Sequence, residues 1–153
     1  MDTPAVDPRP VDASEQEAPP AAPAGPTGAL SYALGFLTFA IPFFGLIIAG
    51  IVMAAVYPSA RRKGGLAAEN ARYAANWGLT VASVGVVLVA AHVVLLLLAS
   101  GTPLARGFSP VGIPMTIFAV LWVVHLVLII VGLVRTNQRV VFRPRIAIPF
   151  FRA

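Results

Sequence analysis

The residues of this chain that could do chemistry are few, and its two histidines come first. His92 and His125 both stand inside long apolar stretches, and the sequence contains no cysteine. Ionisable groups within an apolar span are candidates for function because lipid solvates them poorly. Two imidazoles can hold a haem or a metal ion between helices. Alternatively, each can stay neutral and bond to a nearby backbone carbonyl or hydroxyl group.

The expected depths of the two histidines favour the neutral alternative. With apolar spans at about 73–100 and 112–134, His92 lies about eight residues before the end of its span, and His125 lies about thirteen residues after the start of the next. At 1.5 Å per residue the two depths differ by roughly 7–8 Å, whereas one metal atom needs ligands at nearly equal depth. We therefore predict no metal site and no cofactor.

Catalytic groups are scarce in the rest of the chain. Five of its six carboxylates precede residue 18, and the sixth is Glu69. General acid/base catalysis needs two such groups at one defined site. The sequence contains no glycine-rich phosphate loop, no HExxH motif and no Ser/His/Asp order. We predict that the protein is not an enzyme.

The composition indicates a membrane protein. Hydrophobic residues make up 58% of the 153 positions and charged residues only 11%. No charged residue occurs at positions 18–60, 73–105 or 107–134. Each gap exceeds the roughly 20 residues that a spanning helix requires. The fold class predicted is an all-α integral membrane protein with three transmembrane helices, at about 30–57, 73–100 and 112–134.

The first of these spans is unusual, because it has 28 residues and contains Pro42 and Gly45. Proline removes one helical hydrogen bond and clashes with the preceding turn, so a kink is expected there. A tilted, kinked helix would accommodate the extra length. A shallow interfacial helix followed by a true span is the alternative.

The flanking segments differ from the spans. Residues 1–28 are rich in proline, alanine and acidic residues and are predicted to be disordered, ahead of a membrane domain at 29–153. The C-terminal segment after residue 134 has five arginines, several aromatic residues, Pro144 and Pro149. These features predict an extended segment at the membrane interface.

The distribution of basic residues predicts an orientation. Lys and Arg number one in the tail, four in the first connector, one in the second loop and five in the C-terminal segment. The positive-inside rule then predicts a multi-pass protein of the bacterial inner membrane, with its N-terminus outside and its C-terminus cytoplasmic. The net charge of +5 is attributed to this topology and to anionic lipids of the inner leaflet, and no nucleic-acid partner is expected.

Two groups of residues at the second span are candidates for contacts. Small residues that let helices approach closely recur there, at Ala74, Gly78, Ala82 and Gly85. They could pack against a helix of the same chain or form a homodimer seam. Polar residues lie at the membrane entrance, at Glu69, Arg72 and Asn76. Asn76 is expected to bond to the first span or to the C-terminal segment, or to form part of a lipid or partner site.

Three features resemble one known family. They are the proline-interrupted first span, FLTFAIPFFGLII, the stretch Glu69–Trp77, and the basic, aromatic and proline-containing pattern at 142–150. In this order they resemble the Tic20-like, DUF4870 family of small bacterial membrane proteins, although Asn70 stands where many relatives have His. The resemblance implies a membrane protein without an established biochemical activity.

These observations predict a non-enzymatic accessory or structural subunit. It would act through helix contacts with a membrane complex or with a second copy of itself. A Tic20-like translocation or transport component is the alternative, with the broken first span as its local support. A bis-His haem or metal protein ranks last.

Overall fold

The computed structural model describes residues 25–152, without the side chains of residues 105 and 106, and the described part is helical with no strand. The expected disorder of the tail lies outside these residues, apart from its last four. The elements in chain order are α1 (Ala29–Ala33), η2 (Leu34–Phe39), α2 (Gly45–Ala55), α3 (Tyr57–Lys63), α4 (Gly65–Ala99), η3 (Pro103–Arg106) and α5 (Ile113–Asn137).

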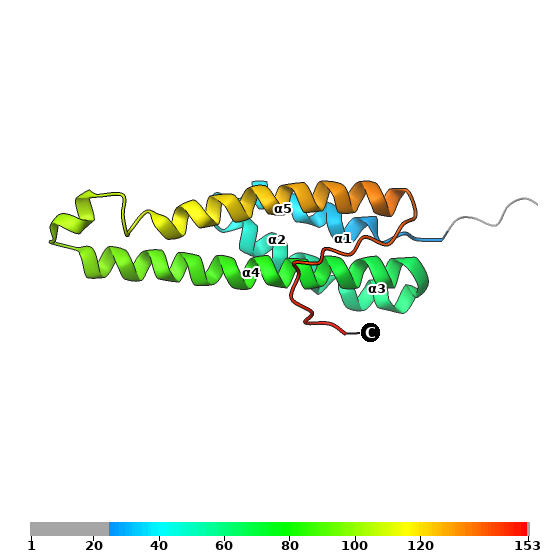
Figure 1. The fold of residues 1–153 in the computed structure, drawn as a ribbon. Helices are drawn as coiled ribbons and strands as arrows, with labels where there is room; N and C mark the ends of the chain where they lie inside the picture. Colours follow the sequence, from blue (N-terminus) through cyan, green and yellow to red (C-terminus); the bar gives the residue numbers. More distant parts are fainter. Residues whose placement is uncertain (1–24, 153) are drawn as a thin grey trace, which may run out of the picture.

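Two long helices, α4 and α5, run antiparallel along the whole molecule (Figure 1). Both are long and apolar enough to cross a membrane, judged by length and composition. The 35 residues of α4 extend over about 52 Å, well beyond the roughly 30 Å of a bilayer core. Its first two turns hold Glu69 and Arg72, so the apolar part begins at about Tyr73. The second and third predicted spans are therefore present as apolar helices.

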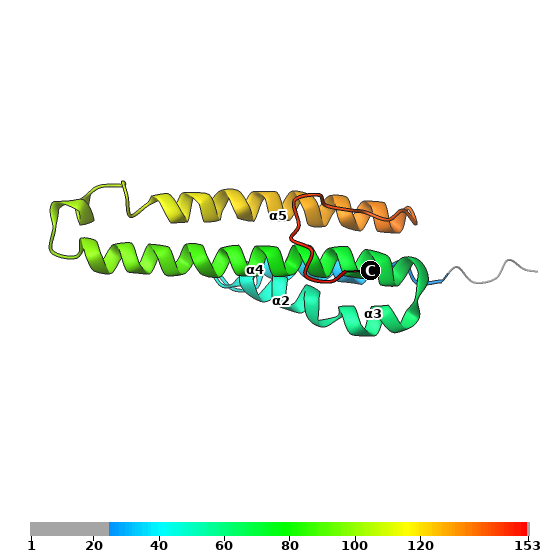
Figure 2. The same ribbon diagram turned by 60° about the horizontal axis from the view of Figure 1, so that its bottom comes forward.

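The first predicted span is not one helix. Between residues 29 and 57 the chain forms α1 and η2, turns at 40–44, and returns as α2. Figures 1 and 2 show this helical hairpin beside the half of the molecule that holds the start of α4 and the end of α5, which we call the inner half. The prediction of a single kinked helix over 30–57 is wrong, and the alternative of an interfacial helix followed by a full span does not describe it either.

Pro42 and Gly45, predicted to produce a kink, instead take part in the reversal. Pro42 has no N–H, and the next residue, Phe43, has a positive φ of 62°. The Gly45 N–H closes the turn by donating to the Ile41 carbonyl at 2.7 Å. A Cβ on Gly45 would clash with the Thr38 carbonyl, so only glycine lets α2 start this close to η2.

Both ends of the hairpin lie at one end of the bundle. The Asn70 amide, near the start of α4, donates to the Thr27 carbonyl at 2.9 Å. A helix that crossed the bilayer over 30–57 would place these residues on opposite sides. The tip of the hairpin lies against Val89 and His92. From Val89, α4 continues for ten residues to Ala99, which is about 15 Å.

Close backbone approaches hold the hairpin to the long helices. Gly50 of α2 and Gly78 of α4 face each other, and a Cβ on either would meet the backbone of the other. The Tyr32 ring lies against Gly132 of α5. The buried core between these elements consists of Tyr32, Leu46, Met53, Ala74, Trp77, Val81, Phe118 and Ile129. Such packing suits a lipid environment, where helices associate through contact rather than through exclusion of water.

After α5 the chain leaves helical structure and returns across α4 as an irregular segment, residues 138–152 (red in Figure 2). The expectation of a non-helical C-terminal segment agrees with this course. Tyr32 anchors the segment by donating its hydroxyl to the Phe142 carbonyl at 3.1 Å.

Candidate functional site at the polar end of the bundle

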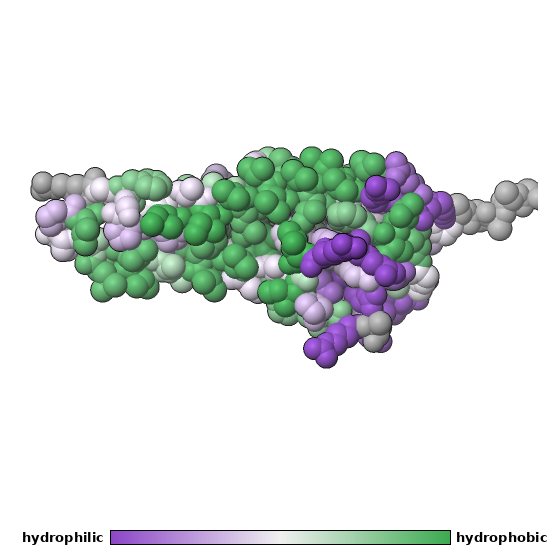
Figure 3. All heavy atoms as spheres, viewed as in Figure 1, coloured by the Kyte–Doolittle hydropathy of each residue, from purple (hydrophilic) through white to green (hydrophobic). Residues whose placement is uncertain are grey.

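Hydrophilic residues gather at one end of the molecule, where the start of α1, α3, the first turns of α4 and the C-terminal segment meet (Figure 3). We call this region the polar end. In the view of Figure 3, most of the remaining surface is hydrophobic. The polar end is therefore the candidate site for polar recognition.

Asn70 is the central residue of the polar end, and its side chain is fully buried. Its Nδ2 donates to the Thr27 carbonyl at 2.9 Å and to the Val140 carbonyl at 3.4 Å. Its Oδ1 accepts the Phe142 N–H at 3.0 Å. One amide thereby joins three segments that are distant in sequence. Backbone groups that lose contact with water need other partners. These bonds therefore hold the segment before α1 and the start of the C-terminal segment against α4.

Asn76 and Thr80 extend this arrangement along the same helix. The Asn76 Nδ2 donates to the Phe151 carbonyl at 3.1 Å, and its Oδ1 accepts the Phe151 N–H at 2.7 Å. The Thr80 hydroxyl donates to the Asn76 carbonyl and accepts the Ile148 N–H, both at 2.8 Å. Asn70, Asn76 and Thr80 therefore form a polar track on α4 to which the C-terminal segment is bound.

Glu69 and Arg72 lie at the surface of the polar end in a small charged group. Glu69 pairs with Arg143 of the C-terminal segment at 2.9 Å and more loosely with Arg72 at 3.9 Å. Both guanidinium groups lie over the Tyr73 ring, at 4.9 Å and 5.4 Å from its centroid. The Arg143 contacts join the C-terminal segment to α4, and their energy is modest because the Arg143 side chain is exposed.

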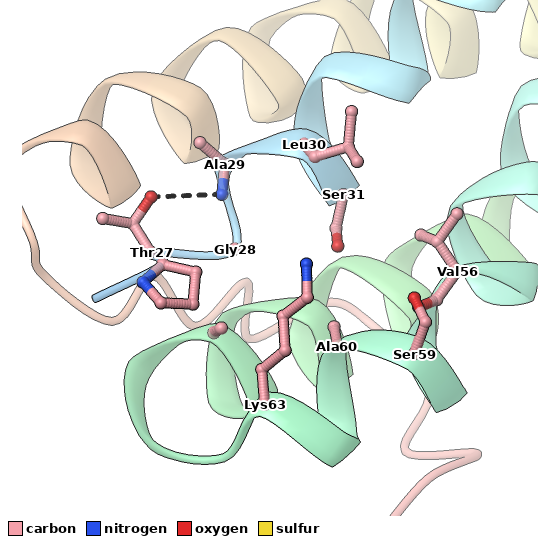
Figure 4. A pocket seen from close by; sticks show the side chains of 11 residues that line it. Thr27, Gly28, Ala29, Leu30, Ser31, Val56, Ser59, Ala60 and Lys63 are labelled. Atoms are coloured by element: carbon pink, nitrogen blue, oxygen red, sulfur yellow. Dashed lines mark hydrogen bonds between the residues drawn. The ribbon is translucent and has the colours of Figure 1, made fainter.

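A cavity of about 190 Å³ lies between the start of α1 and α3 (Figure 4). Lys63 reaches from α3 toward Ser31 of α1, and Ser59 stands on the far side. The Ser59 hydroxyl is already bonded to the Val56 carbonyl at 2.9 Å. Lys63 is the one titratable residue that lines the cavity, so it offers a single positive charge rather than an acid/base pair.

The two histidines lie far apart. The His92 Nδ1 donates to the Val111 carbonyl at 2.9 Å, and the His125 Nε2 donates to the Gly35 carbonyl at 3.1 Å. His125 also stacks on Trp77, which precedes His92 by fifteen residues on α4. That spacing corresponds to about 22 Å. Each imidazole bonds to its own carbonyl, and a shared haem or metal ion does not fit this geometry.

Three polar atoms around His125 and η2 are buried without a partner among the described residues: Thr38 Oγ1, Trp77 Nε1 and His125 Nδ1. Because a carbonyl can only accept, the Nε2 of His125 carries a proton.

The small residues of α4 are used inside the chain. Gly78 contacts Gly50, and Gly85 faces Ile47 of the hairpin. Ala74 is fully buried and Ala82 nearly so. These four small residues form a ridge on α4 that α2 covers. The ridge is therefore not free to form a homodimer seam, and the predicted contacts with a partner cannot be assigned to it.

Sequence reasoning assigned no role to Asn70 and did not single out Gly50 or Gly132. The available signal for Asn70 was an amide in an alanine-rich stretch next to an apolar span, because an amide that becomes buried there needs hydrogen-bond partners. Nothing in the sequence separates Gly50 and Gly132 from the other glycines, because their roles depend on which helices meet.

A comparison with protein families matches residues 26–151 to the MamF/MmsF family, described as the magnetosome magnetite crystal formation protein family. The chain belongs to this family. The match covers most of the sequence and replaces the resemblance to the Tic20-like, DUF4870 family, so that assignment is wrong. Comparisons with curated proteins and with solved structures give no match.

Proposed function

We propose that this protein is a small, non-enzymatic membrane protein that assists the formation of magnetite crystals in magnetosomes. The family to which the chain belongs carries the proposal. Two long apolar helices support the membrane location. The described part supplies few groups for direct chemistry, since its only carboxylate is Glu69 and that group is already paired. The protein would act through contacts with lipid and with neighbouring membrane proteins.

The proposed membrane placement has two spans, α4 and α5, and a hairpin that enters and leaves on the same side. Nine of the ten Lys and Arg residues between positions 25 and 152 belong to the polar end or to the last turn of α5, and Arg106 alone lies in the opposite loop. The positive-inside rule then places the polar end in the cytoplasm. This revises the predicted N-terminus from outside to cytoplasmic and keeps the C-terminus cytoplasmic.

A labelling experiment tests this placement. The chain has no cysteine, so single cysteines introduced by Ser14→Cys, Thr102→Cys or Gln138→Cys report one position each. In intact spheroplasts, a membrane-impermeant maleimide should label only the cysteine at position 102, and all three after lysis. Labelling of position 14 before lysis would restore the three-span topology and contradict the hairpin.

A complementation experiment tests the role. In a magnetosome-forming bacterium that lacks its own family member, this chain should restore magnetite crystal size, measured by electron microscopy. A tagged copy should fractionate with magnetosome membranes, and affinity purification identifies its neighbours. If the chain reaches those membranes and crystal size stays that of the deletion strain, the proposed role is wrong.

A further inference from the structure

The polar end carries more positive charge than its carboxylates neutralise. Within residues 25–152 both ion pairs use Glu69, which serves Arg72 and Arg143. Arg61, Arg62 and Arg152 form no ion pair with any described residue. Guanidinium groups held near one another repel and retain strong, unused hydrogen-bond donors. Arginines gathered in this way are suited to an anionic ligand.

Two adjoining hollows bring these arginines together. One has a volume of about 340 Å³ and is lined by Tyr57, Arg61, Gly65, Ala68, Glu69, Arg72 and Arg152. The other has a volume of about 520 Å³ and is lined by Tyr57, Pro58, Arg61, Arg62 and Phe151. They share Tyr57 and Arg61, and the Tyr57 and Phe151 rings lie 4.7 Å apart.

The arginines come from three separate parts of the chain. Arg61 belongs to α3, Arg72 to α4 and Arg152 to the C-terminal segment. The last is positioned by the two hydrogen bonds between Asn76 and the Phe151 backbone. Together with Arg62 of α3, these residues line the two hollows, and we call the four arginines the arginine cluster. The folded chain assembles this cluster, which no single element would provide.

We propose that this arginine cluster binds the phosphate of an anionic membrane phospholipid. Arginine presents a planar set of donors that matches phosphate oxygens and can bond two of them at once. The adjoining rings belong to Tyr57, which begins α3 directly after the apolar α2, and to Phe151 of the C-terminal segment. Both features match a lipid headgroup at the membrane surface.

An exposed apolar track leads away from the cluster and favours a lipid over a soluble anion. Backbone hydrogen bonds from Val56 to Val52 and from Ala60 to Val56 carry helical geometry from α2 into α3. The exposed residues Ile51, Ala55, Pro58 and Arg62 follow one another at spacings of four, three and four. Ile51 and Ala55 on α2, and Pro58 and Arg62 on α3, are each four residues apart, so each pair shares one face of its own helix. An acyl chain could lie on Ile51 and Ala55 while its phosphate contacts Arg62 and Arg61.

Lipid binding to the purified full chain tests this proposal. Native mass spectrometry in detergent compares phosphatidylglycerol with phosphatidylcholine. The double variant Arg61→Gln/Arg152→Gln removes two arginines of the cluster. The control Arg135→Gln/Arg145→Gln makes the same change in charge at exposed arginines outside both hollows. We expect the first variant to weaken phosphatidylglycerol binding at least about tenfold, and the control to stay within about twofold of wild type.

Three outcomes would overturn the proposal: equal losses in both double variants, no preference of the wild type for phosphatidylglycerol, or displacement of the lipid by inorganic phosphate at constant ionic strength. The last would indicate a site for a soluble anion. Should the double variant fail to fold, Arg152→Gln alone serves, since this residue is exposed. The proposal depends on the membrane placement above and not on magnetite formation. Cysteine labelling tests the membrane placement, and crystal size tests the role in magnetite formation. A failure of either can therefore be told apart from a failure of lipid binding.

Discussion

The two halves of this molecule are built differently. In the half that contains the polar end, the hairpin, α3 and the C-terminal segment cover α4 and α5. In the outer half, the two long helices continue alone to their connecting loop (Figures 1 and 2). Between Val86 and Leu98, α4 has no buried residue, and leucines 97 and 98 are 71% and 74% exposed. The inner half depends on contacts within the chain, whereas the outer half depends on what surrounds it.

The largest effect is expected where two backbones touch in the inner half. Gly78→Ile places a branched side chain against Gly50 and the Met53 Cβ, which lies 2.9 Å from even a single added carbon. Because backbone cannot yield as a side chain does, α2 must leave α4. We expect loss of the folded protein, measured by size-exclusion chromatography in mild detergent and by the yield of folded protein.

The control for this substitution is Ser83→Ile, which adds similar bulk at an exposed position on the same helix. It should leave folding unchanged, since the new side chain faces outward. Normal folding of the Gly78→Ile protein would show that α2 does not pack on this ridge, and the ridge would again be free for a partner.

The next largest effect is expected at the amide that joins three segments. Asn70→Ala leaves the Phe142 N–H and two carbonyls without their bonds. Losing these bonds should lower the free energy of unfolding by about 3 kcal/mol. Unfolding by sodium dodecyl sulfate, followed by circular dichroism, measures the change. Asn137→Ala at the exposed end of α5 is the control and should have almost no effect.

Sequence patterns predicted the long helices well and the hairpin badly. Helices α4 and α5 follow from uninterrupted apolar stretches longer than a bilayer requires. A hairpin and a kinked span both consist of apolar residues throughout, so hydropathy cannot separate them. The distinction depends on the turn at Pro42, the positive φ of Phe43 and the missing Cβ of Gly45. Because the hairpin was taken for a span, the proposed membrane placement also puts the N-terminus on the other side from the one predicted.

The candidate site was also predictable only in part, because local patterns show which residues are polar but not which distant segments meet. Glu69, Arg72 and Asn76 could be singled out by their position before an apolar stretch, and in the structure Glu69 and Asn76 contact the C-terminal segment. The arginine cluster and the role of Asn70 require knowledge of which distant segments meet at that end. A sequence shows the charge of Arg61 and Arg152 but not that a folded C-terminal segment brings them to one hollow.

A smaller effect is expected at His92, where the outer half has one of its few polar contacts. His92→Ala removes the single bond to the Val111 carbonyl. The free energy of unfolding should fall by about 1 kcal/mol, the usual contribution of one hydrogen bond. His125→Ala should cost more, because that ring is buried and also stacks on Trp77. Equal costs for the two variants would contradict the different surroundings described for them.

The smallest effect separates the two halves most directly, because it compares one substitution in both places. Leu98→Ala trims a side chain that is exposed in the outer half, and Leu46→Ala trims one that is buried beneath the hairpin. The first replaces contact with lipid or detergent by the same kind of contact, so the free energy of unfolding should change by less than about 0.5 kcal/mol. The second leaves a cavity and should cost about 2–5 kcal/mol. A large cost for Leu98→Ala, measured in the same detergent titration, would mean that the outer half packs against another protein chain. That chain would then be sought by crosslinking from position 98.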